Sequence, residues 1–190
     1  MKQPQPSNNH GQPPRQYRRT YQSQLRQLNH ARLRWYLPDW YTAAVTEIHA
    51  HELTEQGIQA VMVDLDDTLL GRHEATLQIE VIRWVASLRA AGLKVLILSN
   101  GTPQRVKAAK ARLGIDGFAL VGKPWRVAYQ RGLRQLSSTP RTTVMIGDQL
   151  FTDILGANLM KINSILVRPL SKGSWHTQLL RHIEKLVLQW

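Results

Sequence analysis

The sequence contains no cysteine, which excludes disulfide bonds, thiol catalysis and cysteine-based metal sites. Its seven histidines show no metal-ligand spacing. No run approaches the roughly 20 apolar residues of a membrane-spanning helix, and the N-terminus lacks the apolar core of a secretory signal. We therefore expect a cytoplasmic protein that is either dissolved or bound peripherally at the inner face of the membrane.

Acidic residues are also scarce, because 13 Asp and Glu face 25 Lys and Arg, for a net charge of +12. Residues 1–35 contain seven basic residues and no acidic one. Residues 81–147 contain twelve basic residues and a single acidic one, Asp116. Such a basic exterior favours an anionic substrate or an anionic surface as partner.

The N-terminal segment divides into two parts. Residues 1–15 are rich in Gln, Pro and Asn, a composition that predicts disorder. Residues 17–36 mix arginines with aromatic residues, and Trp40 and Tyr41 follow. A segment of this kind can lie on an anionic bilayer, bind RNA, or remain a solvated tail that packs partly on the domain. We expect residues 1–35 to be a separate basic segment and residues 36–190 to be one folded domain.

Short apolar runs alternate with helical patterns along that domain. The runs at 60–63, 93–98, 118–121, 143–146 and 162–167 predict strands, and the patterns at 74–91, 103–113, 124–136 and 150–160 predict helices, with a last amphipathic helix from about residue 174. This alternation predicts an α/β fold with a parallel sheet flanked by helices. We expect the basic run from Arg105 to Arg112 to be a solvated helix face.

Two carboxylates follow directly behind the first predicted strand. Asp64 and Asp66 lie where open α/β sheets usually bind ligands, and their mutual repulsion calls for a cation. Mg²⁺ suits them because it prefers oxygen ligands and takes few carboxylates. One carboxylate can attack phosphorus while the other transfers protons. Taken alone, the segment up to Thr68 is equally consistent with a polar turn.

Three further polar segments follow the ends of later predicted strands. Ser99 and Asn100 can hold a phosphoryl oxygen, although their loop is also typical of a helix start. Lys123 can neutralise charge on a phosphoryl group, although exposed lysines are common. Asp148 can complete a metal site, and Asp153 can support it or pair with Lys123, although both residues suit the first turn of a helix. The combination favours one site rather than four unrelated loops.

The four segments in this order resemble the motifs of the haloacid dehalogenase (HAD) superfamily, over roughly residues 58 to 168. The resemblance implies a HAD-like Rossmannoid fold. It implies the following roles: Asp64 as nucleophile, Asp66 as general acid and base, Ser99, Asn100 and Lys123 as groups that stabilise the phosphoryl group, and Thr68 and Asp153 as supporting residues. It also implies Mg²⁺ held by Asp64, by the backbone carbonyl of Asp66 and by Asp148.

Two details of the resemblance indicate the type of reaction and the kind of substrate. Phosphatases of the superfamily have the second aspartate, here Asp66, and the dehalogenases lack it. The intervals from Asp66 to Ser99 and from Lys123 to Asp148 are each filled by predicted helices and strands, so we expect no sizeable cap domain. By analogy, family members without a cap act on large or surface-bound substrates.

The segments 63–69 and 147–158, together with 37–39 and 167–170, are similar to the YqeG-type branch of HAD subfamily IIIA. Asp67 departs from that branch, which often has Asn there. The branch includes enzymes of mitochondria and plastids that dephosphorylate phosphatidylglycerophosphate. The resemblance thus implies a lipid phosphate as substrate and peripheral contact with an anionic membrane. Two alternatives stay open: a HAD phosphatase for nucleotides or nucleic-acid ends, and a non-catalytic module that binds RNA or membrane.

Overall fold

The computed structural model describes residues 33–171. Its elements, in chain order, are η2 (Leu33–Tyr36), β1 (Trp40–Thr42), η3 (Val45–Glu47), α2 (Ala50–Glu55), β2 (Ala60–Val63), α3 (Ile79–Ala90), β3 (Lys94–Leu98), α4 (Pro103–Leu113), β4 (Asp116–Phe118), α5 (Arg126–Leu136), η4 (Pro140–Thr142), β5 (Thr143–Gly147), η5 (Leu150–Ile154), α6 (Leu155–Leu159) and β6 (Asn163–Val167). The strands form one parallel sheet in the order β1-β6-β5-β2-β3-β4. The predicted fold class, a parallel sheet between helices, is confirmed.

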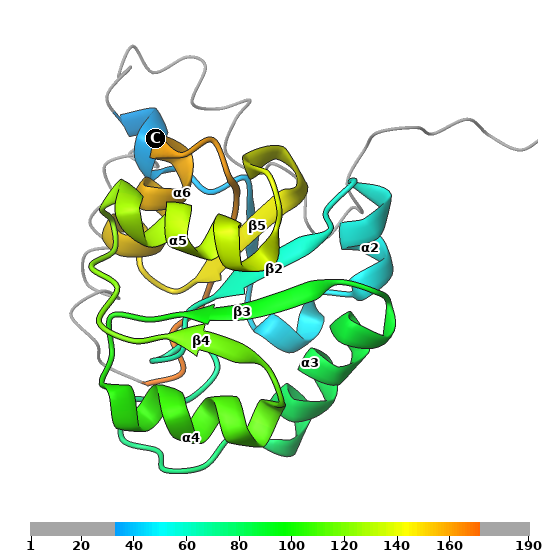
Figure 1. The fold of residues 1–190 in the computed structure, drawn as a ribbon, viewed down its shortest axis with the longest axis vertical. Coiled ribbons are helices and arrows are strands. Elements are labelled where there is room, and N and C mark those ends of the chain that lie inside the picture. The colour runs from blue at the N-terminus through cyan, green and yellow to red at the C-terminus, as the bar shows by residue number, and fades with distance from the viewer. Residues whose placement is uncertain (1–32, 172–190) are drawn as a thin grey trace, which may run out of the picture.

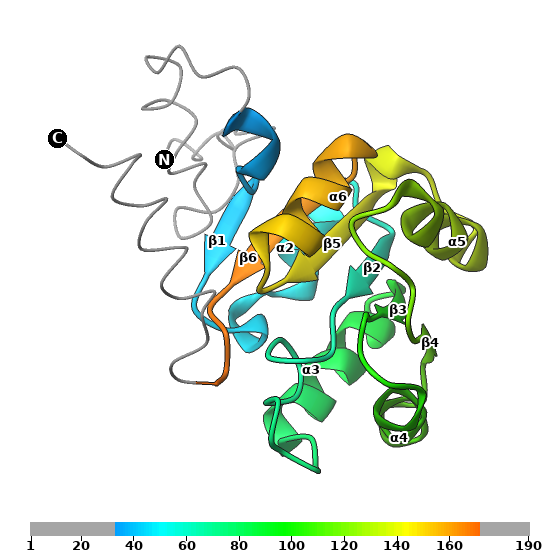
Figure 2. The ribbon, with the colours of Figure 1, turned by 90° about the vertical axis from the view of Figure 1, so that its left-hand side faces the viewer.

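Helices cover both faces of the sheet, with α2, α3 and α4 on one face and α5 and α6 on the other (Figures 1 and 2). The central strands serve both layers because successive side chains point to opposite faces. In β2, Val61 and Val63 pack in the core beneath α3 and α4, whereas Ala60 and Met62 pack beneath α5 and α6. All four residues are fully buried, which explains why this strand is a continuous apolar run.

The register of β2 with its neighbours determines where the polar segments meet. Val63 pairs with Ile97 of β3 on one side and with Ile146 of β5 on the other. The chain leaves β2 towards β3 and later returns on the opposite side through β5, which makes the end of β2 a topological switch point. The residues that follow β2, β3 and β5 therefore share one edge of the sheet.

Only helices and strands of the sheet layers lie between the polar segments. The stretch from Asp66 to Ser99 contains α3 and β3, and the stretch from Lys123 to Asp148 contains α5, η4 and β5. Residues 33–171 thus contain no inserted cap domain. The edge of the sheet at the end of β2 is left uncovered by any separate lid within this part of the chain.

The fourth strand lies earlier than the predicted run at 118–121, because β4 ends at Phe118. The next residues leave the sheet: the amide of Leu120 donates to Gly101 O at 3.2 Å, and that of Val121 donates to Ser99 O at 3.2 Å. Leu120 also has a positive φ of 51°, which is incompatible with a strand. The apolar run marks a loop against the polar edge rather than a strand.

Two predicted helices also start differently in the structure. The helix predicted at 74–91 begins only at Ile79, as α3. The helix predicted at 150–160 begins as a π-helical turn, η5, before α6. Trp40 and Tyr41, which lie in the expected domain 36–190 just after the basic segment, form β1 and pair with β6. The C-terminal helix expected from residue 174 and most of the segment 1–35 lie outside the described residues. The boundary between segment and domain stays a prediction.

None of the helices in residues 33–171 is both long and apolar enough to cross a bilayer.

Candidate active site

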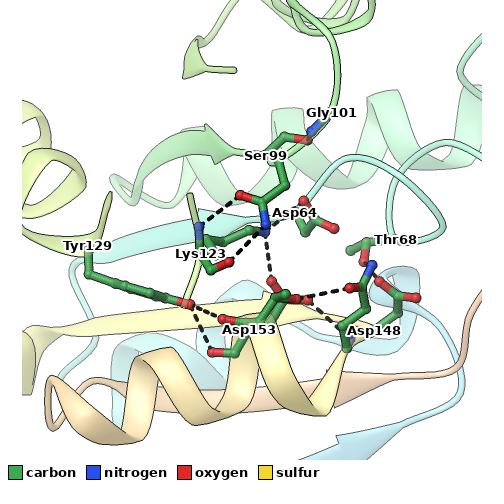
Figure 3. A network of polar contacts seen from close by, with 11 residues as sticks. Asp64, Thr68, Ser99, Gly101, Lys123, Tyr129, Asp148 and Asp153 are labelled. Carbon is green, nitrogen blue, oxygen red and sulfur yellow. Dashed lines mark hydrogen bonds and ion pairs between the residues drawn. The ribbon is translucent and has the colours of Figure 1, made fainter. Parts of the chain in front are cut away.

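Four charged side chains that follow three strands come together at the edge defined above (Figure 3). Asp64 follows β2, and Asp148 follows β5. Lys123 comes from the loop between β4 and α5, and Asp153 comes from the π-helical turn η5. All four residues are buried, with exposed fractions of 0 to 5%. Burying four charges costs several kcal/mol per ion unless they compensate one another, so the cluster is costly to build for folding alone.

Lys123 supplies the positive charge. Its Nζ donates to Asp64 Oδ1 at 2.8 Å and to Asp153 Oδ1 at 2.7 Å. Burial by itself lowers the pKa of Lys123, but Asp153 and Asp64 outweigh it and raise that pKa above its usual value. The ammonium group is therefore permanently charged near neutral pH. Of the two roles expected for Asp153, the pairing with Lys123 is present.

Asp148 is not neutralised by the lysine. Its Oδ1 accepts from the Thr68 hydroxyl at 3.3 Å, and its Oδ2 is buried with no hydrogen-bond partner among the described residues. One oxygen each of Asp64, Asp148 and Asp153 lie within 4.8 Å of one another. Three carboxylates served by one ammonium group leave an excess of negative charge, and hard oxygen donors fit a divalent cation. The residues present therefore fit a metal site.

The protonation of the two strand-end carboxylates reflects this excess. Burial raises the pKa of Asp64 to about 6, with Asp153 adding to the rise and Lys123 opposing it. Burial raises the pKa of Asp148 to about 8, and the charges of Asp153 and Asp64 add to it. Perturbed carboxylates of this kind cluster at functional sites. Without a bound cation, Asp148 would be largely protonated at neutral pH.

The side chain of Asp66 is not part of the carboxylate cluster. Its Oδ1 accepts from Arg105 Nε at 2.7 Å, and a Cβ placed on Gly101 would lie 2.1 Å from its Oδ2. The side chain of Arg105 also donates to the carbonyls of Gly71 and Glu74, each at 3.0 Å. Asp66 is thus held beside the cluster by its own partner. If it contributes to a metal site, as the resemblance implies, its backbone carbonyl is the group to do so.

Arg105 corrects the expectation for the basic helix face. It lies in the run predicted to be solvated, yet its side chain is only 27% exposed and is bonded to Asp66. Other residues of that face, such as Lys107, are exposed as expected. Arg105 deviates because it lies in the first turn of α4, next to the polar edge of the sheet.

Ser99 and Asn100 follow β3 and organise the loop around the site. The Ser99 hydroxyl is buried and accepts from the amide of Gly101 at 2.9 Å. The Asn100 side chain accepts from Lys123 N at 2.8 Å and donates to Lys123 O at 3.0 Å. These paired bonds fix the backbone that carries the lysine. Asn100 therefore positions Lys123, a role that the sequence did not suggest.

Asp153 is supported by residues that sequence reasoning missed. The amide of Gln149 donates to its Oδ2 at 3.1 Å, and a Cβ on Gly147 would lie 2.2 Å from the same oxygen. The buried hydroxyl of Tyr129, on α5, donates to Thr152 O at 2.6 Å (Figure 3). In the sequence, only Gly147, directly before Asp148, could have indicated this support for Asp153. Nothing in the sequence indicated a role for Tyr129, because an aromatic residue on the buried side of a helix is typical of the hydrophobic core.

An open pocket of about 330 Å³ gives access to this cluster. Its lining consists of polar or charged residues and one glycine: Asp64, Asp66, Arg72, Ser99, Asn100, Gly101, Thr102, Arg105 and Gln149. Asp64 therefore faces the open space while Lys123 lies buried behind it. A small anion that enters the pocket meets the carboxylates of Asp64 and Asp66 together with hydrogen-bond donors.

The raised pKa values predict how stability depends on pH. The folded chain binds protons at Asp64 and Asp148 up to about pH 6 and about pH 8, whereas ordinary carboxylates release them near 3.8. The resulting stabilisation is complete below about pH 4 and is lost as the pH rises through these values. In EDTA, we expect the melting temperature to decrease as the pH rises from about 5 to about 8. A divalent cation should raise the melting temperature most at the alkaline end of this range.

Differential scanning calorimetry over this range tests the prediction. The Asp148→Asn variant is the control, because it removes the group with the higher pKa and should flatten the dependence in EDTA. A melting temperature of the unaltered chain that rises steadily towards pH 8 in EDTA would contradict the described electrostatics.

Comparisons with known proteins agree with this geometry. A family model described as haloacid dehalogenase-like hydrolase matches residues 6–160. The chain is 32% identical over 156 residues to the "Probable phosphatase YqeG" of Bacillus subtilis, a match that covers 82% of this chain and 91% of the relative. These matches confirm the HAD and YqeG-type resemblance expected from the motifs, and with it the expectation of a phosphatase.

Two solved structures share the fold at low sequence identity. A protein of Listeria monocytogenes serotype 4b, described as uncharacterized, has a TM-score of 0.51 at 18% identity, with 70% of this chain and 100% of that chain covered. A predicted HAD-like family hydrolase of Porphyromonas gingivalis has a TM-score of 0.51 at 12% identity, with coverage of 66% and 98%. On the strength of the family match, this chain belongs to the haloacid dehalogenase-like hydrolases.

Proposed function

We propose that the chain is a Mg²⁺-dependent phosphomonoester hydrolase that works through an aspartyl-phosphate on Asp64 and converts phosphatidylglycerophosphate to phosphatidylglycerol. The observation that carries the chemistry is the buried arrangement in which Lys123 bonds to Asp64 and Asp153 while Asp148 keeps an oxygen without a partner. This arrangement combines a nucleophile that faces a pocket with a place for a cation behind it.

The chain's own residues account for both chemical steps. A carboxylate oxygen of Asp64 attacks phosphorus, and the bond to the ester oxygen breaks while Asp66 donates a proton to that oxygen. Asp66, now a carboxylate, takes a proton from water, whose oxygen attacks phosphorus and releases phosphate from Asp64. Lys123 keeps the Asp64 side chain oriented and offsets negative charge on the phosphoryl group. Asp66 must loosen its bond to Arg105 when it carries the proton.

Asp64 and Asp148 would hold the Mg²⁺, with Asp153 beside them and the Asp66 carbonyl as a further donor. The ion would supply positive charge for the phosphoryl oxygens. Hard oxygen donors favour Mg²⁺ over softer metals. The partnerless oxygen of Asp148 supports this assignment.

The lipid substrate is supported by the shape and lining of the site. The pocket is open, and residues 33–171 include no cap that would close over a small substrate. No hydrophobic residue is among those that line it, so it suits a phosphorylated headgroup whose acyl chains remain outside. The motif resemblance to phosphatidylglycerophosphate phosphatases points in the same direction. If the lipid stays in the membrane while its headgroup is hydrolysed, the enzyme must bind peripherally to that membrane.

A substrate panel tests this proposal. Phosphate release is measured from vesicles that contain phosphatidylglycerophosphate, from nucleoside monophosphates and from 5′-phosphorylated RNA, each with Mg²⁺ and with EDTA. We expect a kcat/KM at least about tenfold higher for the lipid and a loss of turnover in EDTA. A preference for nucleotides or RNA would instead support the alternative substrate class. Binding of RNA without turnover of any phosphomonoester would support a non-catalytic module.

A further inference from the structure

The loop between β4 and α5 and the first residues of α5 carry three large, exposed apolar side chains close to Lys123 in the sequence. Leu120 is 66% exposed, Trp125 is 74% exposed and Val127 is 68% exposed. We call these three residues the apolar rim. Lys123, between them in the sequence, is buried. The stretch of chain that joins β4 to α5 and begins α5 thus combines one buried lysine with three exposed apolar side chains.

The backbone at two of these positions favours other residue types. Leu120 has a φ of 51°, in the left-handed region that glycine and asparagine adopt most easily. Trp125 is the N-cap of α5 and makes no side-chain cap bond, although Ser, Thr, Asp or Asn would satisfy a helix amide there. Folding stability therefore gives no reason for a leucine and a tryptophan at these positions. Their exposed apolar surface needs another explanation.

A backbone hydrogen bond connects the apolar rim to the pocket lining. The amide of Leu120 donates to Gly101 O at 3.2 Å, and Gly101 lines the pocket. A Cβ on Gly122 would lie 3.6 Å from Trp125 Cδ1, so the indole lies over the residue next to Lys123. A substrate whose phosphate reaches Asp64 would therefore have its remaining part near the rim.

The charge around the rim indicates what covers it. Arg131 and Arg134, further along α5, are exposed, and residues 117–147 contain no acidic residue. Arg126, between Trp125 and Val127, is exposed. Exposed apolar side chains mixed with cationic ones match an anionic lipid surface, where the former enter the interface and the latter contact headgroups.

We propose that the apolar rim is a membrane-docking surface that inserts Leu120, Trp125 and Val127 into an anionic bilayer and so seats the pocket on the headgroup layer. This inference rests on the proposed function, because a lipid phosphate is what such seating would present to Asp64. The inference goes beyond the proposed function because it assigns the membrane contact to the folded domain rather than to the basic N-terminal segment.

Vesicle co-sedimentation of the full chain tests the docking surface. The probes are phosphatidylglycerol-containing vesicles and pure phosphatidylcholine vesicles, both without substrate. We expect the unaltered chain to sediment with the anionic vesicles, and the combined variant Leu120→Ser, Trp125→Ser, Val127→Ser to bind them at least about tenfold more weakly. Leu159→Ser is the matched control, because Leu159 is 45% exposed on α6 and should bind as the unaltered chain does.

A second measurement distinguishes loss of membrane insertion from a folding defect. Trp125→Ser alone supplies a favoured N-cap for α5 and should keep the melting temperature. We expect it to lose a part of the fluorescence quenching that bilayers of brominated phosphatidylglycerol cause in the unaltered chain. Quenching that is unchanged in this variant would contradict insertion of Trp125.

Hydrolysis of soluble p-nitrophenyl phosphate separates the two proposals. The rim variants should keep turnover of this compound within about twofold, because the rim side chains do not line the pocket. The docking surface would be overturned if anionic vesicles bound the combined variant as tightly as the unaltered chain. It would also be overturned if they did not bind the unaltered chain. Neither result would affect the proposed hydrolysis at Asp64. Vesicle binding that depends on the rim, in a chain that hydrolyses no phosphomonoester, would overturn the proposed function alone.

Discussion

The Asp64→Asn variant is expected to lose phosphatase turnover by about 10⁴-fold or more, because an amide cannot serve as the attacking nucleophile. Asp64 is the carboxylate of the buried cluster that lines the pocket. Phosphate release from a soluble phosphomonoester measures the effect without any contribution from membrane binding.

The same substitution is expected to leave the fold intact. Asn has almost the same shape as Asp, and removing one buried carboxylate relieves repulsion from Asp148 and Asp153. The melting temperature in EDTA at about pH 8 should therefore stay equal or rise. Near-normal phosphate release by a well-folded Asp64→Asn chain would rule out this residue as the nucleophile.

The Lys123→Met variant is expected to be destabilised by about 3–5 kcal/mol, the usual cost of removing one partner from a buried charge pair. Methionine has a similar length but no charge, so Asp64 and Asp153 would lose their shared cation. Because protonation can neutralise the carboxylates, the loss should be larger at about pH 8 than at about pH 5. Urea unfolding of the metal-free chain measures it.

A double variant distinguishes charge from packing. Adding Asp153→Asn to Lys123→Met removes one of the two carboxylates left without a cation, so it should restore a large part of the stability. Turnover should stay low, because the positive charge near the phosphoryl group is still missing. A double variant that is as unstable as Lys123→Met would show that lost packing, and not charge, dominates.

The sequence was sufficient for the fold class because local patterns and short motifs determine it. The run at 60–63 is apolar at every position, as a central parallel strand must be, and the polar residues come directly after the strands. Asp64 and Asp148 could be expected at one edge because parallel strands that flank one another end on the same side. The predicted ends of the helices at 103–113 and 124–136 agree with α4 and α5.

The remaining features depend on contacts between residues distant in sequence. Arg105 resembles any other arginine on a basic helix until the fold brings it to Asp66. Tyr129 and the paired bonds of Asn100 act through backbone groups, which no residue pattern encodes. The strand β1 is only three residues long and pairs with β6, which follows more than 120 residues later, so no local pattern indicated that residues 40–42 form a strand.

The most direct test of the central claim is the identity of the residue that carries the phosphoryl group during turnover. The chain is mixed with a soluble phosphomonoester, quenched in acid, reduced with borohydride and digested, and the peptide that contains residue 64 is analysed by mass spectrometry. An aspartyl-phosphate on Asp64 predicts that this residue is recovered as homoserine only when substrate was present. Recovery of the reduced product at Asp66 or Asp148, or at no residue of a chain that releases phosphate at its normal rate, would contradict the account.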